Sequence, residues 1–251
     1  MLGHLALPCA VAFAGCAEED DAAYDHAVLK LHEPVAGAVH PAGEGVPAVA
    51  ELLDLDGFPL PIEDVVWHSD RLEPVLLADM QGELKLPVGI HEIGATVRLP
   101  NGNRLAASVG GVRVQSPATG IYVGESVLRL ELELEGQTVR PACNAGLVFS
   151  IDMAGERILP QTGSCTLELV VFSFDLDYEL SAALDGPAVH GTIRYDVGGL
   201  FMLPFDFEGT IADGVFSAQF GGKIGIPLVG DGMASGSLQA ERVTHWVDPP
   251  P

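Results

Sequence analysis

The residues of this chain that could do acid–base or nucleophilic chemistry do not form a catalytic motif. Asp175 and Asp177 are two positions apart, so a strand would place both carboxylates on one face, where they could act as an acid/base pair. In a chain with 35 Asp and Glu, that spacing is also expected by chance. The sequence contains no G-x-S-x-G nucleophile elbow and no G-x-x-x-x-G-K-[ST] phosphate loop. We therefore expect no enzymatic activity and no cofactor.

Metal-binding patterns are equally weak. Asp54 and Asp56 in "DLDG" offer hard oxygens on a tight turn, which suits Ca²⁺, but the further carboxylates of a full calcium loop are missing. A plain turn is therefore the preferred interpretation, with calcium as the weak alternative. The eight histidines include no i, i+2 or i, i+4 pair, and Ala95 stands where a zinc motif starting at His91 would need its second histidine.

The charge balance excludes one class of partner. Twelve Lys and Arg stand against 35 Asp and Glu, which gives a formal net charge of −23 at pH 7. Such a surface repels phosphate backbones, so we expect no nucleic-acid binding. The charge favours solubility, and it could also attract divalent cations or a basic partner.

The start of the chain combines a short apolar run with a cysteine. Residues 5–15, "LALPCAVAFAG", have the length of a signal-peptide h-region and are too short to span a bilayer. The sequence Phe13-Ala14-Gly15-Cys16 resembles the lipobox of bacterial lipoproteins, although position −3 is Phe rather than Leu and no Lys or Arg precedes the run. The resemblance implies a signal peptide over 1–15 and a lipid anchor on Cys16, followed by an acidic tether over 16–26. An ordinary N-terminal segment with an incidental cysteine is the alternative.

Two further cysteines are expected to pair. Removal of residues 1–15 would remove Cys9 and leave Cys143 and Cys165 besides the anchor, an even pair in an exported protein. They are 22 positions apart, for which loop-closure entropy predicts about 3 kcal/mol of stabilisation. Two buried free thiols are the alternative.

Residues 27–115 show the period-2 stretches and frequent turns of an all-β sandwich. They resemble the bacterial immunoglobulin-like and PKD-like domains, which implies a spacer, adhesion module or binding platform with Trp67 in its core. The residues that carry the resemblance are Pro34, Gly37, Gly45-Val46, Asp54-Leu55-Asp56-Gly57, Trp67-His68-Ser69 and the hairpin "PVGIHEIGATV" over 87–97.

Residues 116–120 are expected to form a linker to a second all-β domain over 121–247, before a proline-rich tail over 248–251. In "VLRLELELEG", Leu128, Leu130, Leu132 and Leu134 alternate with charged residues, as in a strand with one buried and one solvated face. About eight such runs favour an antiparallel meander that closes into a small barrel, with a second sandwich as the alternative. The pattern weakly resembles calycin-like barrels. The phenylalanines of the later strands could line a pocket or fill a core: Phe201, Phe205, Phe207, Phe216 and Phe220.

Together these observations predict a non-catalytic lipoprotein of a Gram-negative cell envelope, held to the outer membrane or cell surface by its lipid. Its role would be structural, adhesive or partner-binding. One alternative is a carrier that holds a small apolar ligand in the second domain. A weaker alternative is a glycan-binding module that uses Trp246. The partner and the oligomeric state are left open by the sequence.

Overall fold

The computed structural model describes residues 24–62, 65–134, 136–168, 173–226 and 230–245, and their regular structure is all strand. This confirms the all-β class. The chain divides into two compact units: most of residues 24–109 form the first, and residues 110–245 form the second together with the short segments 36–46 and 85–91. The domain limits expected from the sequence remain predictions.

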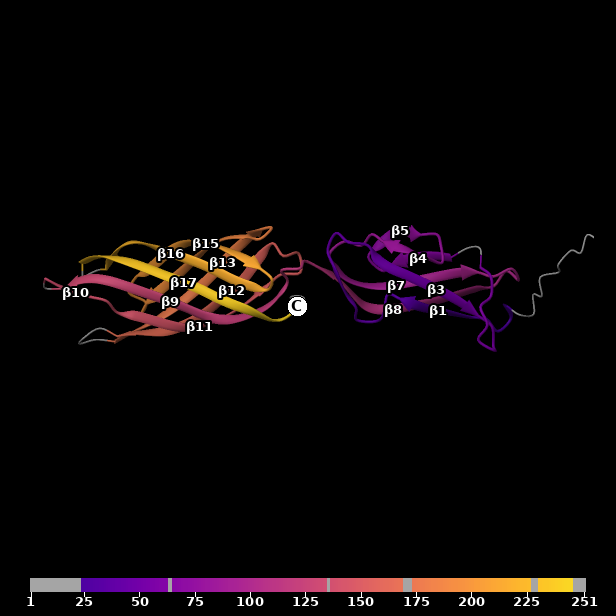
Figure 1. Ribbon diagram of the computed structural model, residues 1–251, viewed down its shortest axis with the longest axis horizontal. Helices are drawn as coiled ribbons and strands as arrows, with labels where there is room; N and C mark the ends of the chain where they lie inside the picture. Colours follow the sequence, from indigo (N-terminus) through magenta and orange to yellow (C-terminus); the bar gives the residue numbers. More distant parts are fainter. Residues whose placement is uncertain (1–23, 63–64, 135, 169–172, 227–229, 246–251) are drawn as a thin grey trace, which may run out of the picture. The chain divides into compact units, whose positions relative to one another are not determined.

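The N-terminal strands form an immunoglobulin-like β-sandwich of two sheets (Figure 1). The three-stranded sheet has the order β1 (Val28–Glu33), β3 (Val46–Leu53), β6 (Gln81–Leu84). The five-stranded sheet has the order β2 (Val39–Pro41), β8 (Arg104–Gln115), β7 (Gly89–Arg98), β4 (Val65–Ser69), β5 (Leu72–Leu77). The β2–β8 pair is parallel, whereas β1–β3, β4–β5 and β4–β7 are antiparallel.

Trp67 lies in the core of this sandwich, as predicted. Its side chain is fully buried on β4, and its indole Nε1 donates a hydrogen bond to the carbonyl oxygen of Asp79 at 2.9 Å. That bond satisfies the one polar group of the buried ring. His91 is also buried, and its Nε2 lies 2.9 Å from the carbonyl oxygen of Pro87, so it is a structural residue of β7.

Tyr24, just before the first strand, is buried. Tyr24 falls in the segment that was expected to be a solvated tether, but only 5% of it is exposed. Its hydroxyl donates a hydrogen bond to the carbonyl oxygen of Pro61 at 3.1 Å. The acidic residues before Tyr24 give this segment the composition of a solvated tether. Burial of the aromatic ring is nevertheless favourable, because it removes a large apolar surface from water.

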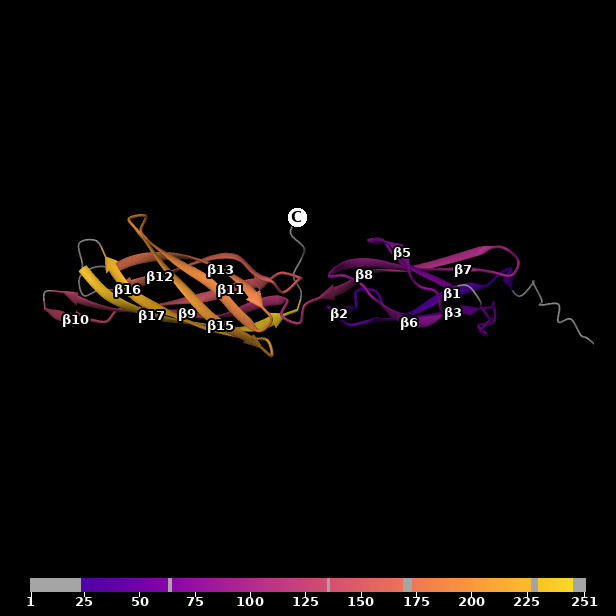
Figure 2. The same cartoon turned by 90° about the horizontal axis from the view of Figure 1, so that it is seen from above.

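The second unit contains a closed eight-stranded antiparallel barrel (Figures 1 and 2). Its strands, in ring order, are β9 (Gly120–Leu134), β11 (Ala142–Ile151), β12 (Arg157–Glu168), β13 (Ser173–Asp185), β14 (Ala188–Val197), β15 (Met202–Ala212), β16 (Val215–Ile226) and β17 (Gly230–Thr244). Pairing of β17 with β9 closes the ring, and the short β10 (Gln137–Val139) extends the sheet beside the end of β9. The second unit is therefore a barrel, as predicted, and the alternative of a second sandwich is wrong.

Alternation along β9 follows the predicted pattern. Leu128, Leu130 and Leu132 are at most 2% exposed and point into the barrel, whereas Glu131 and Glu133 are exposed on its outer face. The last leucine of the run, Leu134, is half-buried at the strand end. The inward leucines join one continuous core with the other barrel strands.

The buried tryptophan yields the first prediction. Trp67→Ala should lower the free energy of unfolding of the sandwich by about 3–5 kcal/mol, because the change leaves a cavity and orphans the Asp79 carbonyl. Phe58→Ala is the matched control, since Phe58 is 67% exposed and its loss should cost less than about 0.5 kcal/mol. Urea unfolding followed by circular dichroism measures both. Equal losses in the two variants would contradict the core role of Trp67.

Candidate functional site

The barrel interior is filled by aromatic rings. Tyr122 and Phe149 stack with ring centroids 5.1 Å apart and planes 3° apart, and Phe149 meets Phe216 edge-on at 5.0 Å. Phe205 and Phe220 lie 5.4 Å apart farther along the barrel. Such offset and edge-on pairs are the favourable geometries for rings packed in a core.

This packing decides between the two interpretations of the phenylalanines. Phe205, Phe207, Phe216 and Phe220 are buried in the continuous barrel core, and Phe201 is partly buried against it. In the described part of the barrel they pack as core residues. Eight strands enclose an interior that side chains are just able to fill, and here they do so.

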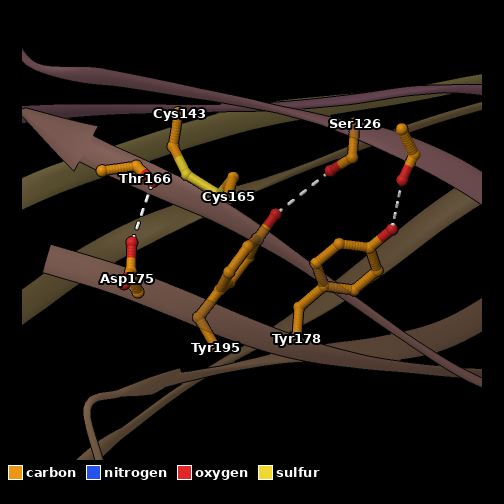
Figure 3. Close-up of a disulfide and its surroundings, with 8 residues drawn as sticks. Ser126, Cys143, Cys165, Thr166, Asp175, Tyr178 and Tyr195 are labelled. Atoms are coloured by element: carbon orange, nitrogen blue, oxygen red, sulfur yellow. Dashed lines mark hydrogen bonds between the residues drawn. A yellow bond between two sulfur atoms is a disulfide. The ribbon is translucent and has the colours of Figure 1, made fainter.

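The polar groups inside the barrel are satisfied by one another or by backbone. The Tyr195 hydroxyl lies 3.2 Å from the Ser126 hydroxyl, and both side chains are buried. The Tyr178 hydroxyl donates to the carbonyl oxygen of Gly146 at 2.7 Å (Figure 3). At one end, Tyr122 donates to the carbonyl oxygen of Ala118 at 2.9 Å. These contacts were not predicted from the sequence, although the inward position of Ser126 on β9 was a signal for them.

Burial raises the pKa values of the barrel tyrosines, which makes them unsuited to acid–base catalysis near neutral pH. It raises the pKa of Tyr195 to about 12, and the hydrogen bond with Ser126 lowers it in part. Burial also raises the pKa of Tyr178. For Tyr122, burial raises the pKa while the charge of Arg242 acts in the opposite direction. These hydroxyls therefore stay protonated at neutral pH and act as structural groups.

The linker between the predicted domains is bound to the barrel. Thr119 is fully buried, and its hydroxyl donates to the carbonyl oxygen of Asp152 at 2.8 Å. The Arg242 guanidinium from β17 donates to the carbonyl oxygens of Pro117 and Thr119. These bonds fix residues 117–119 against the ends of β11 and β17.

The outer face of β12 to β15 is acidic and hollowed. Outward positions on these strands carry Asp175, Asp177, Glu179, Asp196, Asp206 and Glu208, with Arg194 among them. A hollow of about 550 Å³ lies over β12, β13 and β14, next to the exposed Met202. The residues that line it are Thr162, Gly163, Ser164, Asp177, Tyr178, Glu179, Arg194, Asp196 and Met202.

Several carboxylates on this face accept hydrogen bonds, and two of them face each other across neighbouring strands. Asp175 accepts a hydrogen bond from the Thr166 hydroxyl at 2.8 Å (Figure 3), and Asp206 accepts one from Thr192 at 3.2 Å. Asp196 Oδ1 accepts a hydrogen bond from the backbone N–H group of Gly199 at 2.8 Å, and Asp196 lies directly opposite Asp177 in the β13–β14 register. Like charges placed opposite each other are unfavourable in a sheet, and Arg194 lies on the same face, two positions from Asp196.

The other predicted site residues are placed as follows. Asp54 Oδ1 accepts hydrogen bonds from the backbone N–H groups of Asp56 and Phe58, at 2.9 and 2.8 Å, and so forms a turn. Asp175 and Asp177 are exposed on the barrel surface, without the burial that tunes acid–base pairs. Within the described ranges, no three His, Cys, Asp or Glu side chains gather as metal ligands.

The predicted Cys143–Cys165 disulfide is present and buried. It links β11 to β12 with the two Cα atoms 5.8 Å apart (Figure 3). Cys16 and Trp246 lie outside the described residues. No helix in the described part of the chain is long and apolar enough to cross a membrane.

Comparison with known proteins gives no family. No family model and no curated protein matches this chain. Among solved structures, the fibronectin(III)-like modules of Clostridium thermocellum CbhA are 14% identical, with a TM-score of 0.32 over 72% of this chain and 92% of that one. Isotype 1 transferrin binding protein B from serogroup B Neisseria meningitidis is 9% identical, with a TM-score of 0.28 over 78% of this chain and 50% of that one. Both likenesses are too distant to carry an argument, so the architecture rests on the strand pairing described above.

The buried tyrosines predict a loss of stability at alkaline pH. An unfolded tyrosine ionises near pH 10, whereas the pKa of Tyr195 in the fold is about 12, so the folded state binds more protons between these values. The free energy of unfolding of the barrel should therefore fall by about 1 kcal/mol from this group between pH 10 and 11.

Urea unfolding between pH 8 and 11 measures this effect, and Tyr195→Phe supplies the control. The variant should lose less stability over the alkaline range than the wild type, because it has no phenol to ionise. Parallel curves for the two proteins would show that Tyr195 does not contribute.

Proposed function

We propose that this protein is a non-catalytic lipoprotein of a Gram-negative cell envelope that binds a partner through the outer face of its barrel. The single observation that carries the binding role is the contrast between the two faces of the barrel. The inward face is filled by its own aromatic side chains, whereas the outward face of β12 to β14 is hollowed and places Asp177 directly opposite Asp196. A small-molecule carrier is disfavoured by the same filled interior.

Charge supports a basic partner. Asp177 and Asp196 face each other across the β13–β14 pair, and a cation placed between them would relieve their repulsion. The net charge of −23 would also steer a basic partner toward this protein from a distance.

Two features support the proposed location in the cell envelope: the N-terminal sequence and the disulfide. The lipobox resemblance at residues 13–16 favours a lipid on Cys16, and two or more acyl chains give stable anchoring. The buried Cys143–Cys165 disulfide suits an oxidising compartment outside the cytoplasm. The domain limits 27–115 and 121–247 belong to the same proposal, with the acidic segment after Cys16 holding the sandwich off the membrane.

Intact mass of the protein extracted from the membrane fraction tests the anchor. A mature chain that begins at Cys16 and carries a diacylglyceryl group is expected. Cys16→Ala is the control, and it should remain unprocessed and lack the lipid mass. An unmodified wild-type mass would overturn the anchoring.

Site-specific photo-crosslinking in intact cells tests the binding face. A photoreactive residue at Ser164, in the hollow, should yield a partner adduct that one at Ser217, an outward serine on β16, does not. Asp177→Asn/Asp196→Asn should reduce the adduct several-fold, because it removes the facing charges. Glu125→Gln/Glu241→Gln removes the same charge from β9 and β17 and should leave the adduct unchanged. Equal adducts at Ser164 and Ser217 would contradict the proposed face.

A further inference from the structure

The boundary between β11 and β12, called the seam below, is paired differently from the other strand boundaries of the barrel. Strand β11 pairs with β9 along its whole length, from Ala142 to Ile151, and β12 pairs with β13 over nearly all of its own. Between β11 and β12 themselves, the register contains one pair, Ile151 with Ile158, beside the connecting turn. Both strands lie wholly within the described residues. The two strands are therefore neighbours in the ring without a continuous ladder between them.

The sequence of β12 explains where this ladder stops. Its register with β13 shifts between Ile158 and Gln161, which marks a bulge directly after the single β11–β12 pair. Pro160 lies within that bulge and has no N–H group to donate to a ladder. The regular hydrogen bonding that begins at the turn is thus interrupted before it reaches the middle of the strand.

Beyond that point, a hydrogen bond and a disulfide join the two strands, which also share the barrel core. Tyr178, on β13, reaches across β12, and its hydroxyl donates to the carbonyl oxygen of Gly146 on β11 at 2.7 Å. Gly163 on β12 makes room for the ring, because a Cβ there would lie 2.6 Å from ring atom Cε1 of Tyr178. Farther from the turn, the disulfide joins Cys143 on β11 to Cys165 on β12 (Figure 3).

We infer that the Cys143–Cys165 disulfide is a clasp that keeps the barrel closed at the β11–β12 seam, in place of a hydrogen-bonded ladder. With the clasp intact, the seam is held at the turn, at Tyr178 and at the disulfide. Without it, β11 and β12 keep their full pairing with β9 and β13, so the ring opens at this seam and the other strand pairs stay formed. The barrel is then a curved sheet with two new edges.

Native-state hydrogen exchange of the full chain tests the clasp. The wild type is compared with Cys143→Ala/Cys165→Ala, and exchange is read strand by strand. Amides of β11 and β12 are expected to exchange at least about tenfold faster in the double variant, because the opened edges expose them to water. Amides of β15, β16 and the sandwich strand β7 should keep their wild-type rates.

Two results would overturn the clasp. A uniform acceleration over all barrel strands would show that the disulfide stabilises the whole domain by constraining the unfolded chain. Unchanged exchange in β11 and β12 would show that the seam holds without it.

A second variant keeps the inference testable if the double variant does not fold. Tyr178→Phe, with the disulfide intact, removes the hydroxyl that holds Gly146 and should speed exchange in β11 about fivefold. Tyr195→Phe is the matched control, since it removes a buried hydroxyl that does not contact the seam. Equal acceleration of β11 in the two variants would contradict a seam held by Tyr178.

Discussion

Closure of eight strands into a ring is the constraint on which the barrel depends. A ring of this size has an interior that side chains can fill, so every inward position must carry a group that packs there. Phe149 on β11 meets Tyr122 from β9 on one side and Phe216 from β16 on the other. Tyr122 and Phe149 are partners in the β9–β11 ladder, whereas the contact of Phe149 with Phe216 joins strands that are far apart in the chain. Packing of the core and closure of the ring therefore stabilise each other.

A filled interior leaves the outside of the barrel as the surface for the proposed recognition. A ligand could enter only by displacing packed rings, whereas the outward face offers carboxylates and a hollow without moving the core. The facing Asp177 and Asp196 cost stability in the isolated protein and would be stabilised by a cation between them. Destabilising charge of this kind is typical of a surface retained for binding rather than for folding.

Strand β12 belongs both to the proposed binding face and to the seam. Its outward residues Thr162 and Ser164 line the hollow, and its opposite edge is the one that lacks a ladder with β11. Tyr178 belongs to both features, because it lines the hollow and bonds the carbonyl of Gly146 across the seam. A partner seated in the hollow, as proposed, would therefore contact one of the two strands that border the seam.

The sequence by itself determined the strand content and which residues share a face. Period-2 alternation over 128–134, the β-branched setting of Trp67 and the even cysteine pair each led to the observed strand, core residue and disulfide. Alternation does not say which face becomes the inside, nor which strands meet across the ring. The burial of Tyr24, the inward position of the phenylalanines, the Tyr178–Gly146 bond and the hollow depend on pairings between distant segments. Only the tertiary structure decided these, because such contacts form only once the strands that carry them have come together.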